Sequence, residues 1–352
     1  MKLKQRKRIL VAPLNWGLGH ATRCVPIVEA LKFHNFEPVI ASDGAALAFL
    51  KKEFEDLQFV ALPSYNISYP KNPNHYKLKF LKDAPSFLKT IKTEEKVISK
   101  IVEGQNIDGI ISDNRFGVRH HNIPSVFLTH QLRVLSGNTT WLSSKLHQRI
   151  ITKFDQCWVP DVPGHPNLSG TLGHVQNFRS KIKYIGPLSR LKKIDTTNLY
   201  NLIAIISGPE PQRTFLEQKL LMELSRYEGK VLLVKGIMES EQTKVQNGNI
   251  TIYNYMLTNE LELAINQSEL VLSRSGYSTI MDLAALEKNA FLIPTPGQFE
   301  QEYLAKKFSE EQVFASCNQS DFKVELLETI KDYSSLKPLN HKVNYQELFS
   351  LF

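Results

Sequence analysis

Short apolar runs alternate with longer segments of helical periodicity along the whole chain. The runs are rich in Val, Ile and Leu, which is typical of strands buried on both faces of a parallel sheet. They comprise residues 9–12, 38–41, 58–62, 109–112, 125–128 and 156–159 in the first half, and 202–206, 231–234, 250–252, 270–273 and 290–293 in the second. Strands that alternate with helices in this way predict an α/β fold with parallel sheets and helices on both faces.

Each half begins with a strand that a glycine-containing turn follows, so the pattern predicts two Rossmann-like domains. Gly186-Pro187 and the polar stretch after it break regular structure and suit a linker. We therefore expect an N-terminal domain at residues 1–188 and a second domain at residues 189–335. The tail at 336–352 ends in apolar residues, and we expect it to dock onto the body of the protein.

The chain of 352 residues has a net charge of +8 and no apolar run near the ~18 residues of a membrane-spanning helix. Cys24, Cys157 and Cys317 are scattered and suit neither a disulfide framework nor a zinc site, so the reducing cytoplasm is the expected location. The positive charge would suit an anionic membrane surface or a phosphorylated substrate. No nucleic-acid-binding motif is visible, so we expect no nucleic acid partner.

The segment at residues 76–92 mixes lysines with Leu, Phe and Ile side chains. Two interpretations stay open for it. It is either an ordinary amphipathic helix whose lysines face water, or a helix that lies on an anionic bilayer. The second interpretation would make the protein a peripheral protein at the inner face of the cytoplasmic membrane.

The loop after the first predicted strand combines Gly17 and Gly19 with His20. Two glycines permit a tight turn and a close approach of the backbone to a ligand. One interpretation is a dinucleotide-binding turn with Asp43 as the ribose acceptor, although Thr22 occupies the third glycine position of that motif. His20 favours the other interpretation, because an imidazole in such a loop can serve as a general base.

Asp113 and His130 each end a predicted strand and therefore face the same edge of the first sheet, where open α/β sheets bind ligands. Asp113 could orient His20 or act as the base itself, and an Asx turn is the structural alternative. Arg23 lies in the helix after the loop, either beside the site or as a solvated base. We assign Arg23, His130 and the two loop glycines to the acceptor side of the site.

In the second half, a small polar turn joins the fourth predicted strand to a helix. The N–H groups of such a turn and the helix dipole favour an anion, so Ser275 and Gly276 are predicted to bind a diphosphate. Arg274 is a weaker candidate for the same group, and Thr279 is assigned to the nucleotide-sugar site. Asp282 lies in the first turns of the helix, where its carboxylate could accept hydrogen bonds from the two hydroxyls of a ribose.

Two further loops of the second half also follow predicted strands. The first contains a glycine and an arginine before a helix, which suits an anion, and a proline-rich surface turn is its alternative. The second contains amides and carboxylates that suit sugar hydroxyls, and a proline turn before the next helix is its alternative. The residues suited to a donor in these loops are Ser207, Gly208, Arg213, Gln298, Glu300, Gln301 and Glu302.

Together these motifs resemble the glycosyltransferases of the GT-B fold, and most closely family 28, which includes the N-acetylglucosaminyltransferase that makes lipid II of peptidoglycan. The resemblance is specific over residues 274–303, moderate at 17–20 and weak over 51–100. It implies a cleft between two domains and an inverting transfer of a sugar from a nucleotide sugar, UDP-linked and UDP-N-acetylglucosamine as one candidate, to a hydroxyl of a lipid-linked or envelope glycan. Asp282 stands where the family usually has a glutamate and Glu302 where it has a second glutamine, which leaves the donor sugar open.

No D-x-D motif occurs in the chain. Metal-dependent glycosyltransferases typically contain one, so we expect no metal ion and no cofactor beyond the nucleotide-sugar co-substrate. The helix that begins near Ser275 would then stabilise the leaving diphosphate. Three alternatives stay open: a nucleotide-sugar epimerase of the same fold, an NAD-dependent oxidoreductase that uses Gly17, Gly19 and Asp43, and a sugar-nucleotide-binding protein without activity.

Overall fold

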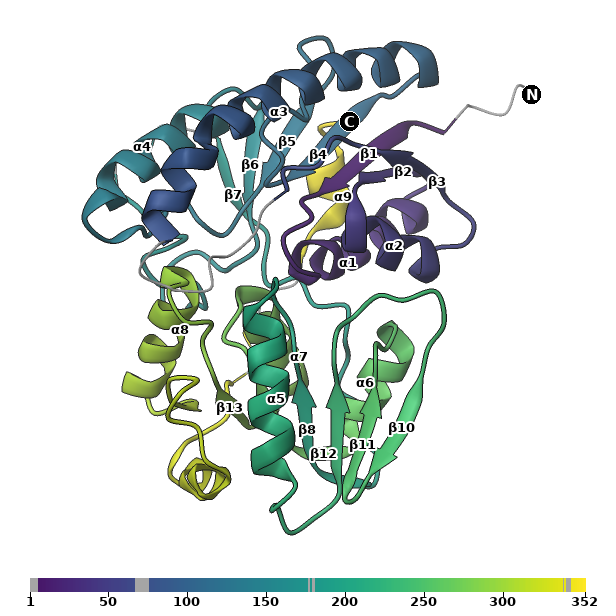
Figure 1. Cartoon of the computed structure of the whole chain (residues 1–352). Coiled ribbons are helices and arrows are strands. Elements are labelled where there is room, and N and C mark those ends of the chain that lie inside the picture. The colour runs from purple at the N-terminus through teal and green to yellow at the C-terminus, as the bar shows by residue number, and fades with distance from the viewer. Residues whose placement is uncertain (1–5, 67–75, 177, 179–180, 338, 340–342) are drawn as a thin grey trace.

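The computed structural model describes residues 6–66, 76–176, 178, 181–337, 339 and 343–352 of the chain. Two seven-stranded sheets form the framework, each flanked by helices (Figure 1). Among the described residues, the strand pairs are parallel except for β10 with β11. The predicted α/β fold with two parallel sheets is therefore confirmed.

The first sheet has the strand order β3-β2-β1-β4-β5-β6-β7. Its strands are β1 (Arg8–Pro13), β2 (Glu37–Ser42), β3 (Gln58–Ala61), β4 (Gly109–Asp113), β5 (Ser125–Leu128), β6 (Gln156–Val159) and β7 (Ile182–Tyr184). The helices of this half are α1 (Gly19–Phe33), α2 (Gly44–Glu53), α3 (Tyr76–Gln105) and α4 (Thr140–Ile151), with a 3₁₀ turn at Gly137–Thr139. Ile9 and Val11 face one apolar core and Leu10 faces another, as a central strand buried on both faces requires.

The second sheet has the strand order β10-β11-β9-β8-β12-β13-β14. Its strands are β8 (Tyr200–Ile205), β9 (Val231–Val234), β10 (Lys244–Asn247), β11 (Ile250–Tyr253), β12 (Ser268–Ser273), β13 (Ala290–Leu292) and β14 (Ala315–Ser316). The helices that follow β8 along the chain are α5 (Gln212–Leu224), α6 (Thr258–Asn266), α7 (Tyr277–Leu286), α8 (Phe299–Glu310), the 3₁₀ helix η3 (Val324–Asp332) and α9 (Tyr345–Phe349), and α9 returns to the first domain. Every predicted strand is present, but the sequence pattern missed β7, β10 and β14. β10 is exposed along its whole length, so no apolar alternation marks it.

The two domains meet along α1 of the first and α7 of the second (Figure 1). Val25 and Val28 of α1 belong to the same apolar core as Ile280 and Met281 of α7. Leu188, at the end of the first domain, is buried in this core, and its backbone N–H lies 3.2 Å from the Met281 sulfur. This shared core places the loop before α1 beside the turn before α7.

The C-terminal residues of the chain pack on the first domain, where α9 lies next to the first sheet (Figure 1). The ring centroid of Phe349 lies 5.6 Å from that of Phe36 and 6.4 Å from that of Trp158. A Cβ atom on Gly109 of β4 would collide with the ring of Phe352. Close packing of aromatic side chains therefore holds the tail against the body of the protein.

The basic segment at residues 76–92 forms the first half of α3, and its side chains are described from Asp83 onward. Glu94 and Ile98 are buried on one side of the helix, whereas Leu88 is exposed. The described part of α3 is thus amphipathic. Across the described residues, no helix combines the length and the apolar character that a bilayer-spanning helix needs.

Candidate active site

The glycine loops of the two domains touch each other. The hydroxyl of Ser278, in the first turn of α7, donates to the carbonyl of Gly19 at 2.8 Å. A Cβ atom on Gly19 would lie 2.9 Å from that hydroxyl, and one on Gly17, whose φ is +71°, would lie 4.0 Å from the Cα of Gly208. Three loops that the sequence places far apart therefore meet between the domains, at the carboxyl ends of both central strands.

His20 and Asp113 form a hydrogen-bonded pair on the first domain. Nδ1 of His20 lies 2.8 Å from Oδ1 of Asp113, and the histidine side chain is 13% exposed while the carboxylate is fully buried. Nδ1 of His20 also lies 2.9 Å from Nη2 of Arg23. The ionised carboxylate can only accept, and Nη2 already donates to Oδ1 of Asp113, so we assign the proton of the neutral ring to Nδ1, which donates to Asp113. Nε2 of His20 is then a proton acceptor.

The environment of Asp113 separates its role from that of His20. Burial alone would raise the pKa of Asp113, but the Arg23 guanidinium and the hydrogen bonds from Arg23 and His20 outweigh it and bring the pKa to about 2. A carboxylate of such low basicity accepts a proton poorly near neutral pH. The geometry therefore favours His20 as the base and Asp113 as the group that orients it.

Arg23 is only 2% exposed, so its interpretation as a solvated base is wrong. Its Nε donates to Oδ2 of Asp113 at 2.6 Å and its Nη2 donates to Oδ1 of the same carboxylate. Its Nη1 lies 3.0 Å from Nδ1 of His130. Arg23 thus fixes Asp113 through two hydrogen bonds and links it to the next strand end.

His130 reaches from the first domain to the second. Nε2 of His130 lies 3.0 Å from Oε1 of Glu300, and the ring stacks on Tyr277 with a centroid distance of 4.2 Å and an interplanar angle of 5°. Gln131 donates to the other oxygen of Glu300. His130 is therefore held by two residues of the second domain, which the sequence did not predict.

The N-terminus of α7 is formed as expected, but the side chain of Ser275 has a protein partner. Its hydroxyl donates to the carbonyl of Gln301 at 2.8 Å, and Gly276 is the residue before the first turn of the helix. The amide oxygen of Gln301 accepts from the N–H of Thr295 at 2.8 Å. Ser275 and Gln301 thus tie α7 to the loop before α8, and the N–H groups of the first helical turn have no partner within the helix.

Asp282 lies on the side of α7 that faces the linker. Its carboxylate accepts from the hydroxyl of Ser189 at 2.6 Å. Burial raises the pKa of Asp282 to about 6, although the Ser189 hydrogen bond and the charge of Arg190 act in the opposite direction. The predicted ribose acceptor is therefore a carboxyl group that titrates close to physiological pH.

Both predicted donor-binding arginines have protein partners. The guanidinium of Arg274 is buried and donates to the carbonyls of Ile293 and Pro294 at 3.2 and 3.1 Å. Arg213 pairs with Glu210 at 2.5 Å and with Glu217 at 2.7 Å. In this arrangement Arg274 organises the loops of the second domain, and Arg213 stabilises the start of α5.

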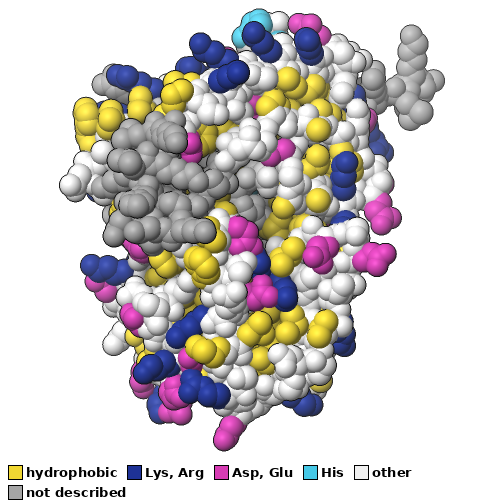
Figure 2. Space-filling view, viewed as in Figure 1, with side chains coloured by type: hydrophobic (Ala, Val, Ile, Leu, Met, Phe, Trp, Pro, Cys, Tyr) yellow, Lys and Arg dark blue, Asp and Glu magenta, His cyan; other side chains and the backbone are white. Residues whose placement is uncertain are grey.

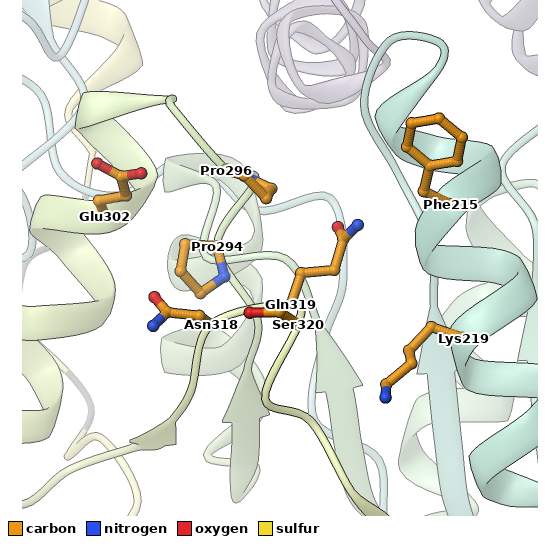
Figure 3. A pocket seen from close by; sticks show the side chains of 8 residues that line it. All are labelled: Phe215, Lys219, Pro294, Pro296, Glu302, Asn318, Gln319 and Ser320. Carbon is orange, nitrogen blue, oxygen red and sulfur yellow. The ribbon is translucent and has the colours of Figure 1, made fainter. Parts of the chain in front are cut away.

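Glu302 and Gln301 face different ways, because they are adjacent on α8. Gln301 is buried, whereas Glu302 is exposed and accepts from the N–H of Gly297 at 2.8 Å. Glu302 lines an open pocket of about 490 Å³, in which Phe215 and Lys219 of α5 face the loop after β14 (Figure 3). Gln298 precedes the first turn of α8, and Ser207 and Thr279 are half-buried near the domain contact.

Two hydroxyl groups at the ligand edge of the second sheet were missed by the sequence analysis. Among the described residues, Ser273 and Thr295 have buried hydroxyls without a hydrogen-bond partner. The Thr295 hydroxyl lies 3.9 Å from the position of a Cβ atom on Gly208, whose φ is +106°. Orphan buried hydroxyls are rare in folded proteins and are candidates for ligand contacts. A serine or threonine at a strand end has no distinctive sequence signal.

The structure does not support Asp43 as the ribose acceptor of a dinucleotide site. Its carboxylate accepts from Nη1 of Arg115 at 2.6 Å and from the amide of Asn15 at 3.2 Å. Arg115 also donates to Glu94 of α3 at 2.7 Å, so Asp43 belongs to a buried ion-pair network that holds α3 in place. Within the ranges that the structure describes, no group of three or more His, Cys, Asp or Glu side chains is arranged to hold a metal ion.

Two Rossmann-like domains that share one site in this way define the GT-B fold of glycosyltransferases, and known structures bear this out. The calicheamicin glycosyltransferase CalG4 superposes with a TM-score of 0.60 at 10% identity, covering 93% of this chain and 90% of that one. MurG of Acinetobacter baumannii superposes with a TM-score of 0.53 at 14% identity, covering 99% of both chains. At these identities the likeness shows the fold.

Sequence comparison identifies the second domain more closely. Residues 210–346 match the glycosyltransferase family 28 C-terminal domain. The expected resemblance is confirmed there. Over 102 residues the chain is 33% identical to the UDP-N-acetylglucosamine–N-acetylmuramyl-(pentapeptide) pyrophosphoryl-undecaprenol N-acetylglucosamine transferase of Methylobacterium radiotolerans. That alignment spans 27% of this chain and 28% of the relative.

Proposed function

We propose that the protein is a metal-independent, inverting glycosyltransferase that moves a sugar from a UDP-linked donor to a hydroxyl of a lipid-linked or envelope glycan. The observation on which this rests is the His20–Asp113 pair, placed where the loop of the first domain touches the N-terminus of α7. A proton acceptor and an anion-binding helix end on facing domains are what glycosyl transfer from a nucleoside diphosphate needs. The named Methylobacterium relative, which uses UDP-N-acetylglucosamine and a pyrophosphoryl-undecaprenol acceptor, supports these substrate classes.

In the proposed reaction, Nε2 of His20 takes the proton of the acceptor hydroxyl as its oxygen attacks the anomeric carbon of the donor sugar. Asp113 holds Nδ1–H and stabilises the imidazolium that forms. The nucleoside diphosphate leaves from the opposite face of the sugar, which inverts the anomeric centre. The N–H groups at the start of α7 stabilise the developing charge of the diphosphate, so no metal ion is needed for this step.

On the donor side, Asp282 would accept hydrogen bonds from the ribose hydroxyls. The diphosphate would lie against the backbone of the two glycine turns that contain Gly208 and Gly276, within reach of the orphan hydroxyls of Ser273 and Thr295. The predicted donor-sugar contacts are Gln298, Gln301 and Glu302. Ser207 and Arg213 are predicted to bind a phosphate, and Thr279 is assigned to the nucleotide-sugar site. Because Gln301 is buried and Glu302 is exposed, we place Gln301 closer to the sugar.

A lipid-linked acceptor calls for contact with a membrane surface, and the outer face of α4 is suited to it. Trp141 is 72% exposed, and Leu142 and Leu146 are exposed beside Lys145 and Arg149. Figure 2 shows apolar side chains next to Lys and Arg side chains at the upper left, over α4. A helix face of this composition binds anionic bilayers through apolar burial and charge attraction. We therefore propose a peripheral protein at the cytoplasmic face of the membrane, without a nucleic acid partner.

The first experiment is a calorimetric titration of the full chain with UDP, GDP, TDP and NAD. A nucleotide that binds the folded state also stabilises it by mass action. UDP binding that Asp282→Ala abolishes is the expected result. UDP-N-acetylglucosamine is then incubated with and without a polyprenyl-pyrophosphoryl glycan, and the products are analysed. A glycosylated acceptor supports transfer, a new sugar nucleotide without acceptor identifies an epimerase, and binding of NAD alone would contradict the proposal.

Membrane contact is tested separately, by co-sedimentation with vesicles of neutral lipid and with vesicles that contain anionic lipid. We expect the wild type to sediment with the anionic vesicles at low salt and to be released at high salt. Trp141→Ser should weaken this binding, whereas the change Phe33→Ser, at an exposed position at the end of α1, should not. Equal sedimentation of the wild type and Trp141→Ser would exclude the face of α4 as the contact surface.

A further inference from the structure

Glu300 is the residue through which the donor domain holds the first domain at the centre of the site. It lies in the first turn of α8, and both of its carboxylate oxygens accept hydrogen bonds from the loop after β5. Oε1 accepts from Nε2 of His130 at 3.0 Å and Oε2 accepts from the amide of Gln131. A half-buried carboxylate with partners on the facing domain fixes the position of those partners as well as its own.

The ring of His130 has one defined tautomer. Nδ1 lies 3.0 Å from Nη1 of Arg23, and a guanidinium can only donate, so Nδ1 must accept. The proton of the ring is therefore on Nε2, the nitrogen that faces Glu300. A second proton on Nδ1 would point at Arg23, which keeps the ring neutral, and burial also lowers the pKa of His130. The charged and titratable groups around the ring are Arg23, Glu300, His20, His147 and Tyr277.

Arg23 connects His130 to His20, the proposed base, through Asp113. The same guanidinium that donates to His130 also donates to both oxygens of Asp113, and Asp113 holds Nδ1 of His20 at 2.8 Å. The series Glu300–His130–Arg23–Asp113–His20 is thus continuous, and it crosses from the donor domain to the acceptor domain. Tyr277 also fixes His130, because its ring stacks on the imidazole. Tyr277 follows Gly276 directly and is the first residue of α7.

We propose that Glu300 is a positioning residue for His20, acting across the domain boundary through His130 and Arg23. This inference rests on the proposed function of His20 as the base. Glu300 lies in the first turn of α8, directly after the loop that is predicted to bind the donor sugar, so the proposal ties the alignment of the base to the placement of that loop. Its consequence is that a change at Glu300 impairs the chemical step even where binding of the nucleotide is intact.

The kinetic test compares Glu300→Gln, His130→Phe and the double variant, with UDP-N-acetylglucosamine as donor. The phenylalanine keeps a ring to stack on Tyr277 but removes both hydrogen bonds of His130. We expect each single change to lower kcat by about 10-fold or more, and the double variant to fall within about 3-fold of the worse single variant, because residues that act as one unit are non-additive. The affinity for UDP should change by less than about 3-fold.

Glu310→Gln is the matched control, because Glu310 is an exposed carboxylate at the end of the same helix and forms an ion pair with Lys306 of that helix. Its kcat should equal that of the wild type. Independent losses that multiply in the double variant would overturn the proposal. So would a rise in KM for the donor with an unchanged kcat in Glu300→Gln, since that result describes a direct contact with the donor.

A second measurement does not depend on turnover. In ¹⁵N spectra of the histidine rings of the full chain without substrate, we expect His130 as the neutral Nε2–H tautomer and His20 as the Nδ1–H tautomer. Glu300→Gln should disturb the signals of His20, and Glu310→Gln should not. If the wild type turns over no nucleotide sugar, the proposed function is wrong. The spectra would still show whether Glu300 influences His20. Signals of His20 that are identical in Glu300→Gln and the wild type would overturn it.

Discussion

Asp113 and Asp282 are carboxylates of different domains, and their surroundings shift their pKa in opposite directions. Burial by itself would raise the pKa of both groups. Asp113 receives two hydrogen bonds from a buried guanidinium, and its pKa falls to about 2. Asp282 receives one from the neutral hydroxyl of Ser189, and its pKa rises to about 6. The partner of a buried carboxyl, more than its burial, therefore decides which protonation state the fold favours.

The two domains differ in the same way at the candidate site. The first domain presents a charged assembly in which Arg23, Asp113 and His20 hold one another. The second domain presents backbone N–H groups and the hydroxyls of Ser273 and Thr295, while Arg213 and Arg274 bind partners within that domain. The proposed reaction needs this difference between the domains. The base must be held in one orientation, whereas the diphosphate must be stabilised in the transition state and still be released as product.

The largest effect is expected from His20→Ala. Without the proton acceptor, kcat should fall by about 10²–10⁴-fold, whereas the affinity for UDP should stay within a factor of about 2, because the proposed nucleotide site lies on the second domain. Steady-state rates and calorimetry on the same sample measure both. His121→Ala, at an exposed loop histidine, is the control and should behave as the wild type. Equal activity of both variants would remove His20 from the mechanism.

Asp113→Asn should come next and should affect stability as well as rate. An amide leaves Arg23 buried without its counter-charge, which costs about 3 kcal/mol of unfolding free energy, and kcat should fall about 100-fold. Because the folded-state pKa of about 2 lies below the ordinary 3.8, the ionised form contributes about 2 kcal/mol above pH 4, and this is lost as the pH falls toward 2. Denaturant unfolding at a series of pH values should show this acid loss in the wild type. Its persistence in Asp113→Asn would assign it to another group.

Asp282→Asn should raise the free energy of unfolding near neutral pH, whereas Asp113→Asn should lower it. The folded-state pKa of about 6 lies above the ordinary 3.8, so ionisation of Asp282 costs the fold about 2–3 kcal/mol, a cost that grows between pH 4 and 6 and is complete above pH 6. The asparagine variant should therefore be more stable than the wild type near pH 7.5 and bind UDP about 10-fold more weakly. The affinity of the wild type for UDP should also fall below pH 6, where the carboxyl is protonated. A less stable variant would show that burial does not raise this pKa.

The smallest effect is expected from Thr295→Val, which removes an orphan hydroxyl without changing the shape of the side chain. The free protein should be as stable as the wild type or slightly more so, because no hydrogen bond is lost. Binding of the donor should weaken by about 3–10-fold, the effect of one neutral hydrogen bond. Thr329→Val, at an exposed threonine in η3, is the control. Unchanged affinity for the donor would place Thr295 outside the donor site.

The sequence alone determined the strands of both sheets other than β7, β10 and β14, and the position of the glycine turns. Runs such as residues 9–12 and 231–234 are apolar on both faces, and only a central parallel strand accommodates such a run. The match of residues 210–346 to family 28 agrees with the motif around Ser275 and Gly276. These features are local, because backbone conformation and burial pattern are written in neighbouring residues.

Only the tertiary structure decided what the charged side chains do. Arg23 and Arg274 look alike in the sequence as arginines beside glycine turns, yet Arg23 orients the proposed base while Arg274 binds loop carbonyls. Glu300 meets His130 although 170 positions separate them. A hydrogen bond between domains depends on how the shared core of α1 and α7 sets the two sheets, and no short stretch of sequence contains that information. Charge and hydrogen bonding act through space over a few ångströms, so the partner of a polar side chain becomes defined only when the whole chain is folded.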